Sequence, residues 1–179
     1  MRRIAAVLAV VAVVLLPTGC DSAATADVNA TPTTRPMMSA SGHDLTGWDA
    51  ARADAVAKEK LSPLGYKVTR EDGTERAFTS DLLNEKRSGV FACVVCALPL
   101  YSSDTKYDSG TGWPSFWREI DEDHVVTMPD VSYGMVRTEV ECGRCNSHLG
   151  HVFTDGPAPT GLRHCINGVS LTFVPSDIG

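Results

Sequence analysis

Two Cys-x-x-Cys pairs restrict this 179-residue chain more than any other feature of its sequence. Cys93 and Cys96 form the first pair and Cys142 and Cys145 the second, with 45 residues between the pairs. Such pairs can place four thiolates around one tetrahedral Zn²⁺, in a site that is closed to substrate. We therefore expect a structural zinc with a large insertion between its two halves. Short-range disulfides, a redox-active pair or a four-thiolate iron centre are the alternatives.

The first twenty residues have the pattern of an export signal rather than of a folded element. Arg2 and Arg3 precede an apolar run of 13 residues, which suits a signal-peptide core but is short for crossing a bilayer. The run leads into LPTGC, which ends at Cys20 and resembles the lipobox of bacterial lipoproteins. We expect residues 1–19 to be removed and Cys20 to be acylated, so that the protein is anchored outside the cytoplasm at the bacterial cell membrane. Secretion without a lipid is the alternative.

The rest of the chain suits a flexible linker followed by one globular domain. Residues 20–43 are mostly small or polar and lack apolar periodicity, a composition that cannot bury enough surface to fold. Residues 44–179 have the length of a single domain. Removing the two signal arginines from 16 Lys+Arg leaves 14 against 22 Asp+Glu, a formal charge of −8. This charge argues against nucleic acid as a partner, and we expect a monomer.

The domain is predicted to be mainly β with short helices at its N-terminal end. Alanine, lysine and glutamate favour a helix from Trp48 to Leu61, which Ser62-Pro63 ends, and a second short helix is predicted over Ser80–Glu85. After Gly89 the sequence breaks into short β-prone runs without helical connections, which indicates antiparallel pairing. These runs are Val90–Val95, Val125–Met128, Met135–Val140, His164–Asn167 and Val169–Val174.

Cys165 is the one cysteine that neither the lipobox nor the two pairs use. In a strand, Arg163, Cys165 and Asn167 would share one face, with His164 and Ile166 on the other. Arginine and asparagine are unusual neighbours for a core cysteine, and a guanidinium nearby favours the reactive thiolate. Cys165 is therefore a candidate nucleophile. A buried cysteine that packs as a small hydrophobe is the alternative.

Two further segments contain groups that could act with such a nucleophile. His148, His151 and Asp155 lie within eight residues and could provide acid–base catalysis. His148 could instead replace Cys145 as a zinc ligand. Trp113 lies in an aromatic loop between residues 106 and 117 that could form the apolar wall of a pocket, although core packing would explain the same residues.

These segments together resemble the methionine-R-sulfoxide reductases, the MsrB family, over roughly residues 44–175. The resemblance includes both cysteine pairs and several longer stretches in the order of the family. The stretches are Gly73–Phe78 (GTERAF), Tyr107–Phe116 (YDSGTGWPSF), Gly134–Val140 (GMVRTEV), His148–Gly156 (HLGHVFTDG), Pro159–Asn167 (PTGLRHCIN) and Phe173–Pro175 (FVP).

The resemblance implies a zinc-ribbon-like fold of two antiparallel sheets, a structural zinc and reduction of methionine-R-sulfoxide, chiefly in oxidised proteins. Cys165 matches the nucleophile and Arg163 its electrostatic activator. The other matching positions all contact the substrate. They are His148, His151 and Asp155, which bind and protonate the sulfoxide oxygen, Asn167, which completes the polar wall, and Trp113, which packs on the methyl group. Thiolate attack on a protonated sulfoxide would leave Cys165 as a sulfenic acid.

The chain departs from the family at three positions. Thr111 stands where some members have a resolving cysteine, so we expect a thioredoxin-like protein or a small thiol to reduce the sulfenic acid directly. His164 replaces the usual Tyr or Phe, and Gly168 replaces Ser. A zinc-stabilised binding module with a structural Cys165 and an iron-containing electron carrier are the competing functions.

Overall fold

The computed structural model describes residues 37–176 of the chain. These residues belong to one compact unit, Arg35–Gly179. The predicted signal peptide, Cys20 and the linker up to residue 36 lie outside the described residues. Within residues 37–176, no helix combines the length and the apolar character needed to cross a membrane.

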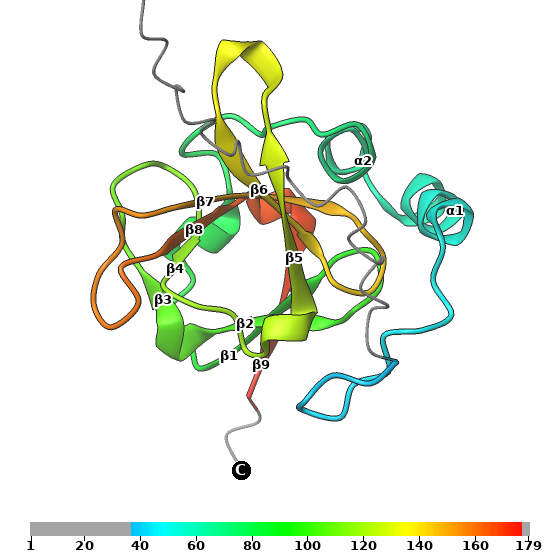
Figure 1. Cartoon of the computed structure of the whole chain (residues 1–179), viewed down its shortest axis with the longest axis horizontal. Coiled ribbons are helices and arrows are strands. Elements are labelled where there is room, and N and C mark those ends of the chain that lie inside the picture. The colour runs from blue at the N-terminus through cyan, green and yellow to red at the C-terminus, as the bar shows by residue number, and fades with distance from the viewer. Residues whose placement is uncertain (1–36, 177–179) are drawn as a thin grey trace, which may run out of the picture. The chain divides into compact units, whose positions relative to one another are not determined.

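Two antiparallel sheets form the centre of the described domain, which confirms the predicted mainly β class (Figure 1). One sheet has the strand order β2-β1-β9 and the other the order β3-β4-β8-β7-β6-β5. The strands of the described part are β1 (Gly89–Cys93), β2 (Pro99–Ser102), β3 (Lys106–Tyr107), β4 (Ser115–Phe116), β5 (Val125–Asp130), β6 (Arg137–Cys142), β7 (His148–Phe153), β8 (Arg163–Ile166) and β9 (Leu171–Pro175). The core lies between the sheets, where Tyr101 of β2 stacks on Phe116 of β4 with ring centroids 4.4 Å apart.

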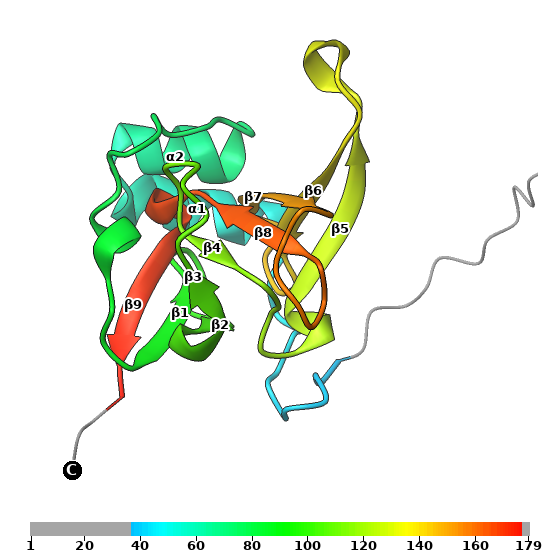
Figure 2. The same cartoon turned by 90° about the vertical axis from the view of Figure 1, so that its left-hand side faces the viewer.

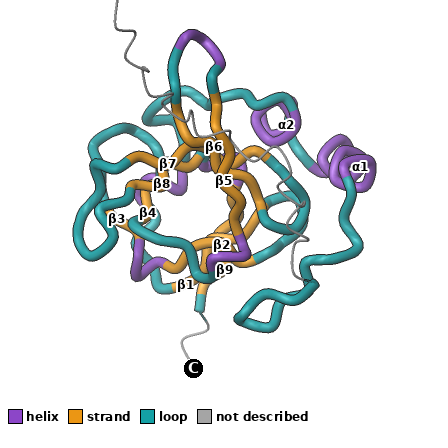
Figure 3. Tube along the Cα trace, in the orientation of Figure 1, coloured by secondary structure: helices purple, strands orange, loops and turns teal. Residues whose placement is uncertain are grey.

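Two α-helices lie at the periphery, outside the strands (Figure 3). The predicted first helix is α1 (Ala50–Lys60), whose first turn is capped by Asp49. The sequence Ser62-Pro63 does end this helix, but it also begins α2 (Pro63–Arg70), which the sequence analysis missed. The Ser62 hydroxyl accepts a hydrogen bond from Gly65 N, and proline suits the first turn because its missing N–H would have no partner there. Over the predicted Ser80–Glu85 helix the chain forms only a 3₁₀ turn, Asp81–Asn84.

The predicted strands are present, but several begin late or were missed. The predicted strand from Met135 begins at Arg137, and the strand predicted from Val169 begins at Leu171. A 3₁₀ turn, Gly168–Ser170, directly precedes Leu171, whereas Met135 and Val136 are irregular and follow a 3₁₀ turn at Ser132–Gly134. Strands β2, β3, β4 and β7 were not predicted. In β7, Gly150 interrupts the β-prone residues, which hid this strand from the sequence analysis. Glycine is required there because a Cβ would lie 2.1 Å from the Cys165 carbonyl oxygen, closer than any side chain can approach.

The folded domain begins before the predicted boundary at residue 44. Ser39 is buried, and its hydroxyl hydrogen bonds to the buried His124 ring at 2.9 Å. The backbone N–H of Ser41 donates to Asp121 at 2.6 Å. The linker predicted for residues 20–43 therefore extends too far toward the C-terminus. Ser39 and Ser41 are hydrogen-bonded to His124 and Asp121, which are 85 and 80 residues away in the sequence.

Candidate active site

The register of the large sheet places the candidate nucleophile in a row of polar side chains. Cys165 of β8 pairs directly with His151 of β7 on one side and with Ser115 of β4 on the other. Glu139 of β6 pairs with His151 in turn. Directly paired residues of antiparallel strands project from the same face of a sheet. The fold thus brings a thiol, a hydroxyl, an imidazole and a carboxylate from four strands to one surface.

The predicted alternation is confirmed over Arg163–Ile166 of β8, whereas Asn167, which was expected on the face of Cys165, lies past the end of the strand and is buried. His164 and Ile166 are buried in the core, whereas Arg163 and Cys165 are only partly buried. Cys165 is a free thiol, and its Sγ lies 3.8 Å from Thr111 Oγ1. It lines a pocket of about 120 Å³ together with Trp113, His151, Phe153 and Asn167. The pocket therefore joins the predicted nucleophile with the predicted indole wall.

Burial raises the pKa of the Cys165 thiol, although Thr111, Arg163 and Ser115 act in the opposite direction. Burial thus opposes the thiolate that Arg163 favours. The Arg163 guanidinium is itself paired with Asp155, which accepts from Arg163 Nε at 2.8 Å and from Arg163 Nη2 at 2.9 Å. This two-pronged ion pair offsets the charge that the sequence analysis assigned to thiolate stabilisation.

Asp155 does not join the two histidines, which corrects its predicted role. Phe153 at the end of β7 pairs with Arg163 at the start of β8, so the turn between them brings Asp155 beside Arg163. The Arg163 hydrogen bond lowers the pKa of Asp155 below its usual value. The structure thus places Asp155 with Arg163 rather than with the candidate proton donors.

We expect Asp155→Asn to accelerate alkylation of Cys165 by iodoacetamide at pH 7. Removing the carboxylate frees the Arg163 charge, which lowers the thiol pKa and raises the thiolate fraction about three- to tenfold. The measurement is the alkylation rate between pH 6 and pH 10, with Glu59→Gln as a control that removes an exposed carboxylate on α1. A pH profile that is the same in wild type and Asp155→Asn would contradict this account.

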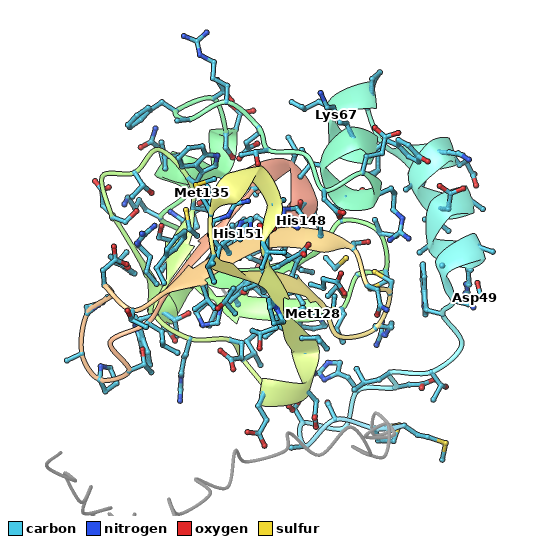
Figure 4. All side chains as sticks on the ribbon, turned by 45° about the horizontal axis from the view of Figure 1, so that its top comes forward. Asp49, Lys67, Met128, Met135, His148 and His151 are labelled. Carbon is cyan, nitrogen blue, oxygen red and sulfur yellow. The ribbon has the colours of Figure 1, made fainter. Side chains whose placement is uncertain are left out.

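The two histidines are each held by a carboxylate that the sequence analysis missed. His148 Nδ1 donates to Glu139 Oε1 at 2.5 Å, and His151 Nε2 donates to Asp130 Oδ2 at 2.8 Å. The rings lie with their centroids 5.5 Å apart, and Figure 4 shows both beside the β5–β6 hairpin. Burial lowers the pKa of His151, while the Asp130 hydrogen bond opposes this shift. Glu139 lay within the family motif, but Asp130 gave no signal of its own.

Asp130 links His151 to a second charged group. It also accepts from Arg137 Nη2 at 2.5 Å, and hydrogen bonds from Ser132 and then His151 hold its pKa far below the usual range. Asp130 therefore stays ionised near neutral pH. An ionised carboxylate fixes the His151 tautomer with a proton on Nε2 and favours the imidazolium whenever that ring gains a second proton.

Asn167 and Trp113 are positioned by one buried residue, Glu75, which the sequence analysis gave no role. The Asn167 side-chain oxygen accepts from Glu75 N at 3.0 Å, and Trp113 Nε1 donates to Glu75 O at 3.1 Å. The Glu75 carboxylate accepts from Gly168 N at 2.5 Å and from Val169 N at 3.2 Å. Burial raises the pKa of Glu75, and these N–H groups oppose the shift. Glu75 thus connects the residues that follow Cys165 to two walls of the pocket.

The Cys165 pocket opens beside a larger cavity of about 570 Å³. The two share Thr74, Arg137 and His151. Residues 71–74 form one wall of the larger cavity, and the β5–β6 hairpin, which projects from the sheet in Figure 2, forms the other. His148 lines this cavity and not the Cys165 pocket. His151 is therefore the histidine nearer to the thiol.

The four cysteines of the two Cys-x-x-Cys pairs come together as predicted, and all four are buried. Two sulfur pairs, Cys93–Cys145 and Cys96–Cys142, are 3.6 and 3.5 Å apart. These separations exclude disulfides and approach the edge of about 3.8 Å expected for four sulfurs around Zn²⁺. The donor set and its geometry therefore fit a zinc ion, and His148, which binds Glu139, is not part of this group.

The two other departures from the family are accommodated by neighbouring residues. A Cβ at Gly168 would lie 1.8 Å from Ser80 Oγ, so Ser80 occupies the space of the missing side chain. His164 lies in the core, where its Nδ1 hydrogen bonds to the Tyr101 hydroxyl at 3.2 Å. Neither residue lines the pocket that contains Cys165.

Comparison with known proteins gives a consistent result. Residues 61–175 match the model of the SelR domain. The peptide methionine sulfoxide reductase MsrB of Thiobacillus denitrificans is 53% identical over 129 residues, which cover 72% of this chain and 98% of that protein. The MsrB proteins of Synechococcus sp. and Pseudomonas putida are 54% and 55% identical over 116 and 117 residues, each 65% of this chain and 85% and 88% of theirs.

Proposed function

The chain belongs to the MsrB family of peptide methionine sulfoxide reductases, and we propose that it reduces methionine-R-sulfoxide in oxidised proteins through attack of Cys165 on the sulfoxide sulfur. The observation that carries this mechanism is the direct pairing of Cys165 with His151 in a pocket that also contains Trp113. A nucleophile, a proton carrier and an apolar surface for the methyl group thereby face one small volume.

Burial raises the pKa of Cys165 and lowers that of His151, which favours a neutral thiol beside a neutral imidazole. Attack requires the thiolate, and loss of the sulfoxide oxygen requires a proton. The Cys165 proton therefore passes through His151 to the oxygen, and the ionised Asp130 stabilises the transient imidazolium. The thiol and the sulfoxide together yield methionine and Cys165 sulfenic acid, with no net proton taken up.

An external thiol then restores the enzyme. The thiol attacks the sulfenic sulfur, which releases water and leaves a mixed disulfide, and a second thiol frees Cys165 as a disulfide of the reductant forms. Two observations support this route. The other described cysteines are gathered in the buried four-sulfur group, and a hydroxyl, that of Thr111, lies 3.8 Å from the Cys165 sulfur at the position where some family members have the resolving cysteine. A thioredoxin-like protein or a small thiol fits the role.

We further propose that the four-cysteine group holds a structural Zn²⁺. The ion would crosslink the two sheets, because Cys93 ends β1 of the small sheet and Cys142 ends β6 of the large one. Cys96 and Cys145 would complete the tetrahedron. All four thiolates would then be unavailable for redox chemistry.

The proposed location is outside the cytoplasm, with the protein anchored to the membrane through acylated Cys20. The apolar run and the lipobox-like LPTGC support this location. Residues 21–36 would separate the domain from the membrane, which would allow it to reach oxidised protein substrates. Intact-mass spectrometry of the membrane-bound chain tests the acylation, and a mass without lipid would instead indicate simple secretion.

We expect turnover of a peptide methionine-R-sulfoxide with dithiothreitol and at least about 100-fold slower turnover of the S epimer, since one pocket must place both the methyl group and the oxygen. Without reductant, one equivalent of methionine should form and dimedone should label Cys165, which identifies the sulfenic acid. Equal rates for the two epimers would contradict the proposed substrate. An intramolecular disulfide in place of the dimedone adduct would contradict the proposed recycling.

A further inference from the structure

Phe78 combines two properties that are unfavourable in a free protein. Its side chain is 69% exposed to solvent, and its backbone φ is +65°. The left-handed region is uncommon for residues other than glycine and is a genuine outlier for a bulky side chain. Such strain is concentrated at binding and catalytic sites, where the surrounding structure enforces it. A strained phenylalanine on the surface therefore calls for a functional reason.

Phe78 packs against the loop that contributes Trp113 to the Cys165 pocket. Its N–H donates to Gly112 O at 2.8 Å. Its ring carbons lie 2.8 and 2.9 Å from the position that a Cβ on Gly112 would take, so the ring covers the face of this glycine. The two neighbours of Gly112 are Thr111, which contacts the Cys165 sulfur, and Trp113, which lines the pocket. The exposed ring is thus next to the loop that forms one side of the pocket.

We propose that Phe78 is a specificity determinant that binds an apolar side chain next to the oxidised methionine of an extended polypeptide. This inference rests on the proposed reduction of protein-bound methionine sulfoxide and extends it to the neighbouring residues. The larger cavity beside the pocket is lined by charged groups such as Lys67, Glu71, Asp130 and Arg137, so Phe78 adds an exposed apolar ring next to a charged cavity. Methionines are mostly buried, so the residues next to them in the chain are often apolar and become accessible when the protein unfolds. The Phe78 ring is suited to bind such an apolar neighbour.

A protein reductant also has to approach Cys165. A sulfoxide-bearing polypeptide is the better occupant, because it must cross the pocket entrance on both sides of its inserted methionine. A thiol reductant needs only to reach the sulfur. Assays that use dithiothreitol throughout remove the protein reductant and leave the substrate as the one partner tested.

The test compares Phe78→Asn with wild type on three substrates with dithiothreitol as the reductant. The substrates are N-acetyl-methionine-R-sulfoxide and two pentapeptides in which glycines or leucines flank the R-sulfoxide. Asparagine tolerates a positive φ, so the variant removes the ring without disturbing the backbone. We expect kcat/KM to fall about tenfold for the leucine-flanked peptide, equivalent to about 1.4 kcal/mol, and less than twofold for the other two substrates.

Two further variants sharpen the comparison. Val174→Thr removes apolar surface from a residue that is 52% exposed on β9 of the small sheet, and it should leave all three substrates unchanged. Phe78→Leu should recover most of the rate on the leucine-flanked peptide. Because asparagine relieves backbone strain, the Tm of Phe78→Asn should not fall and should rise by about 2–6 °C.

An equal loss on all three substrates would overturn the proposal, since the ring would then only support the Gly112 loop. No loss on any of them would overturn it as well. Failure of the underlying function would look different, because wild-type protein would then not reduce N-acetyl-methionine-R-sulfoxide.

Discussion

Replacing Cys142 by serine is expected to leave the domain unfolded at 25 °C. Zinc binding to four thiolates contributes about 10–16 kcal/mol of folding free energy, whereas a domain of this size is stable by about 5–15 kcal/mol. Serine is a poor zinc ligand, and its hydroxyl would be left among three buried cysteines. Since β1 and β6 end at this group, the two sheets would lose the crosslink between them.

Circular dichroism and metal analysis of Cys142→Ser measure this effect. We expect no cooperative melting transition and less than one zinc per chain, and wild-type protein should unfold when a strong chelator removes its metal. Cys165→Ser serves as the matched cysteine control and should keep one zinc and the wild-type Tm. A Cys142→Ser protein that melts at the wild-type temperature would show that the four sulfurs are not a structural metal site.

Replacing Cys165 by serine is expected to lower the turnover of methionine-R-sulfoxide by about 10⁴-fold or more. A hydroxyl is a far weaker nucleophile near neutral pH, and oxygen cannot form the sulfenic acid that stores the sulfoxide oxygen. Ser115 and Thr111 already surround the sulfur with hydroxyl groups, so the substitution alters the chemistry more than the packing.

Steady-state kinetics with dithiothreitol check this prediction, and the Tm confirms that the variant is folded. The variant should still bind the sulfoxide peptide, because Trp113, His151 and Asn167 remain in the pocket. Activity that survives in Cys165→Ser would remove the nucleophile from the mechanism. It would also revive the competing view of this domain as a zinc-stabilised binding module.

Local sequence patterns were sufficient for the parts of the site that lie along one strand. The alternation of Arg163, His164, Cys165 and Ile166 follows from strand geometry, so the exposed and buried sides could be assigned without a fold. The spacing of the cysteine pairs likewise indicated one four-sulfur group, because a Cys-x-x-Cys turn places both sulfurs on the same side.

The partners across strands could not be predicted in this way. Asp155 is near the histidines in sequence, yet it binds Arg163, because the β7–β8 turn returns the chain to that residue. The carboxylates that hold His148 and His151 come instead from Glu139 on the adjacent strand β6 and from Asp130 on β5, one strand further. The pairing register selects these partners, and the register depends on the whole sheet.

The sequence by itself determined the chemistry available to the domain: Cys165 outside the two cysteine pairs, His148 and His151 close to each other, and a cysteine pattern suited to zinc. Tertiary structure alone decided which groups meet. It raised the pKa of Cys165 through burial, paired Arg163 with Asp155 and placed Phe78 beside Gly112. The physical reason is that residue types and short-range periodicity are properties of the local chain. Burial and ion pairing depend on contacts between segments that are far apart in sequence.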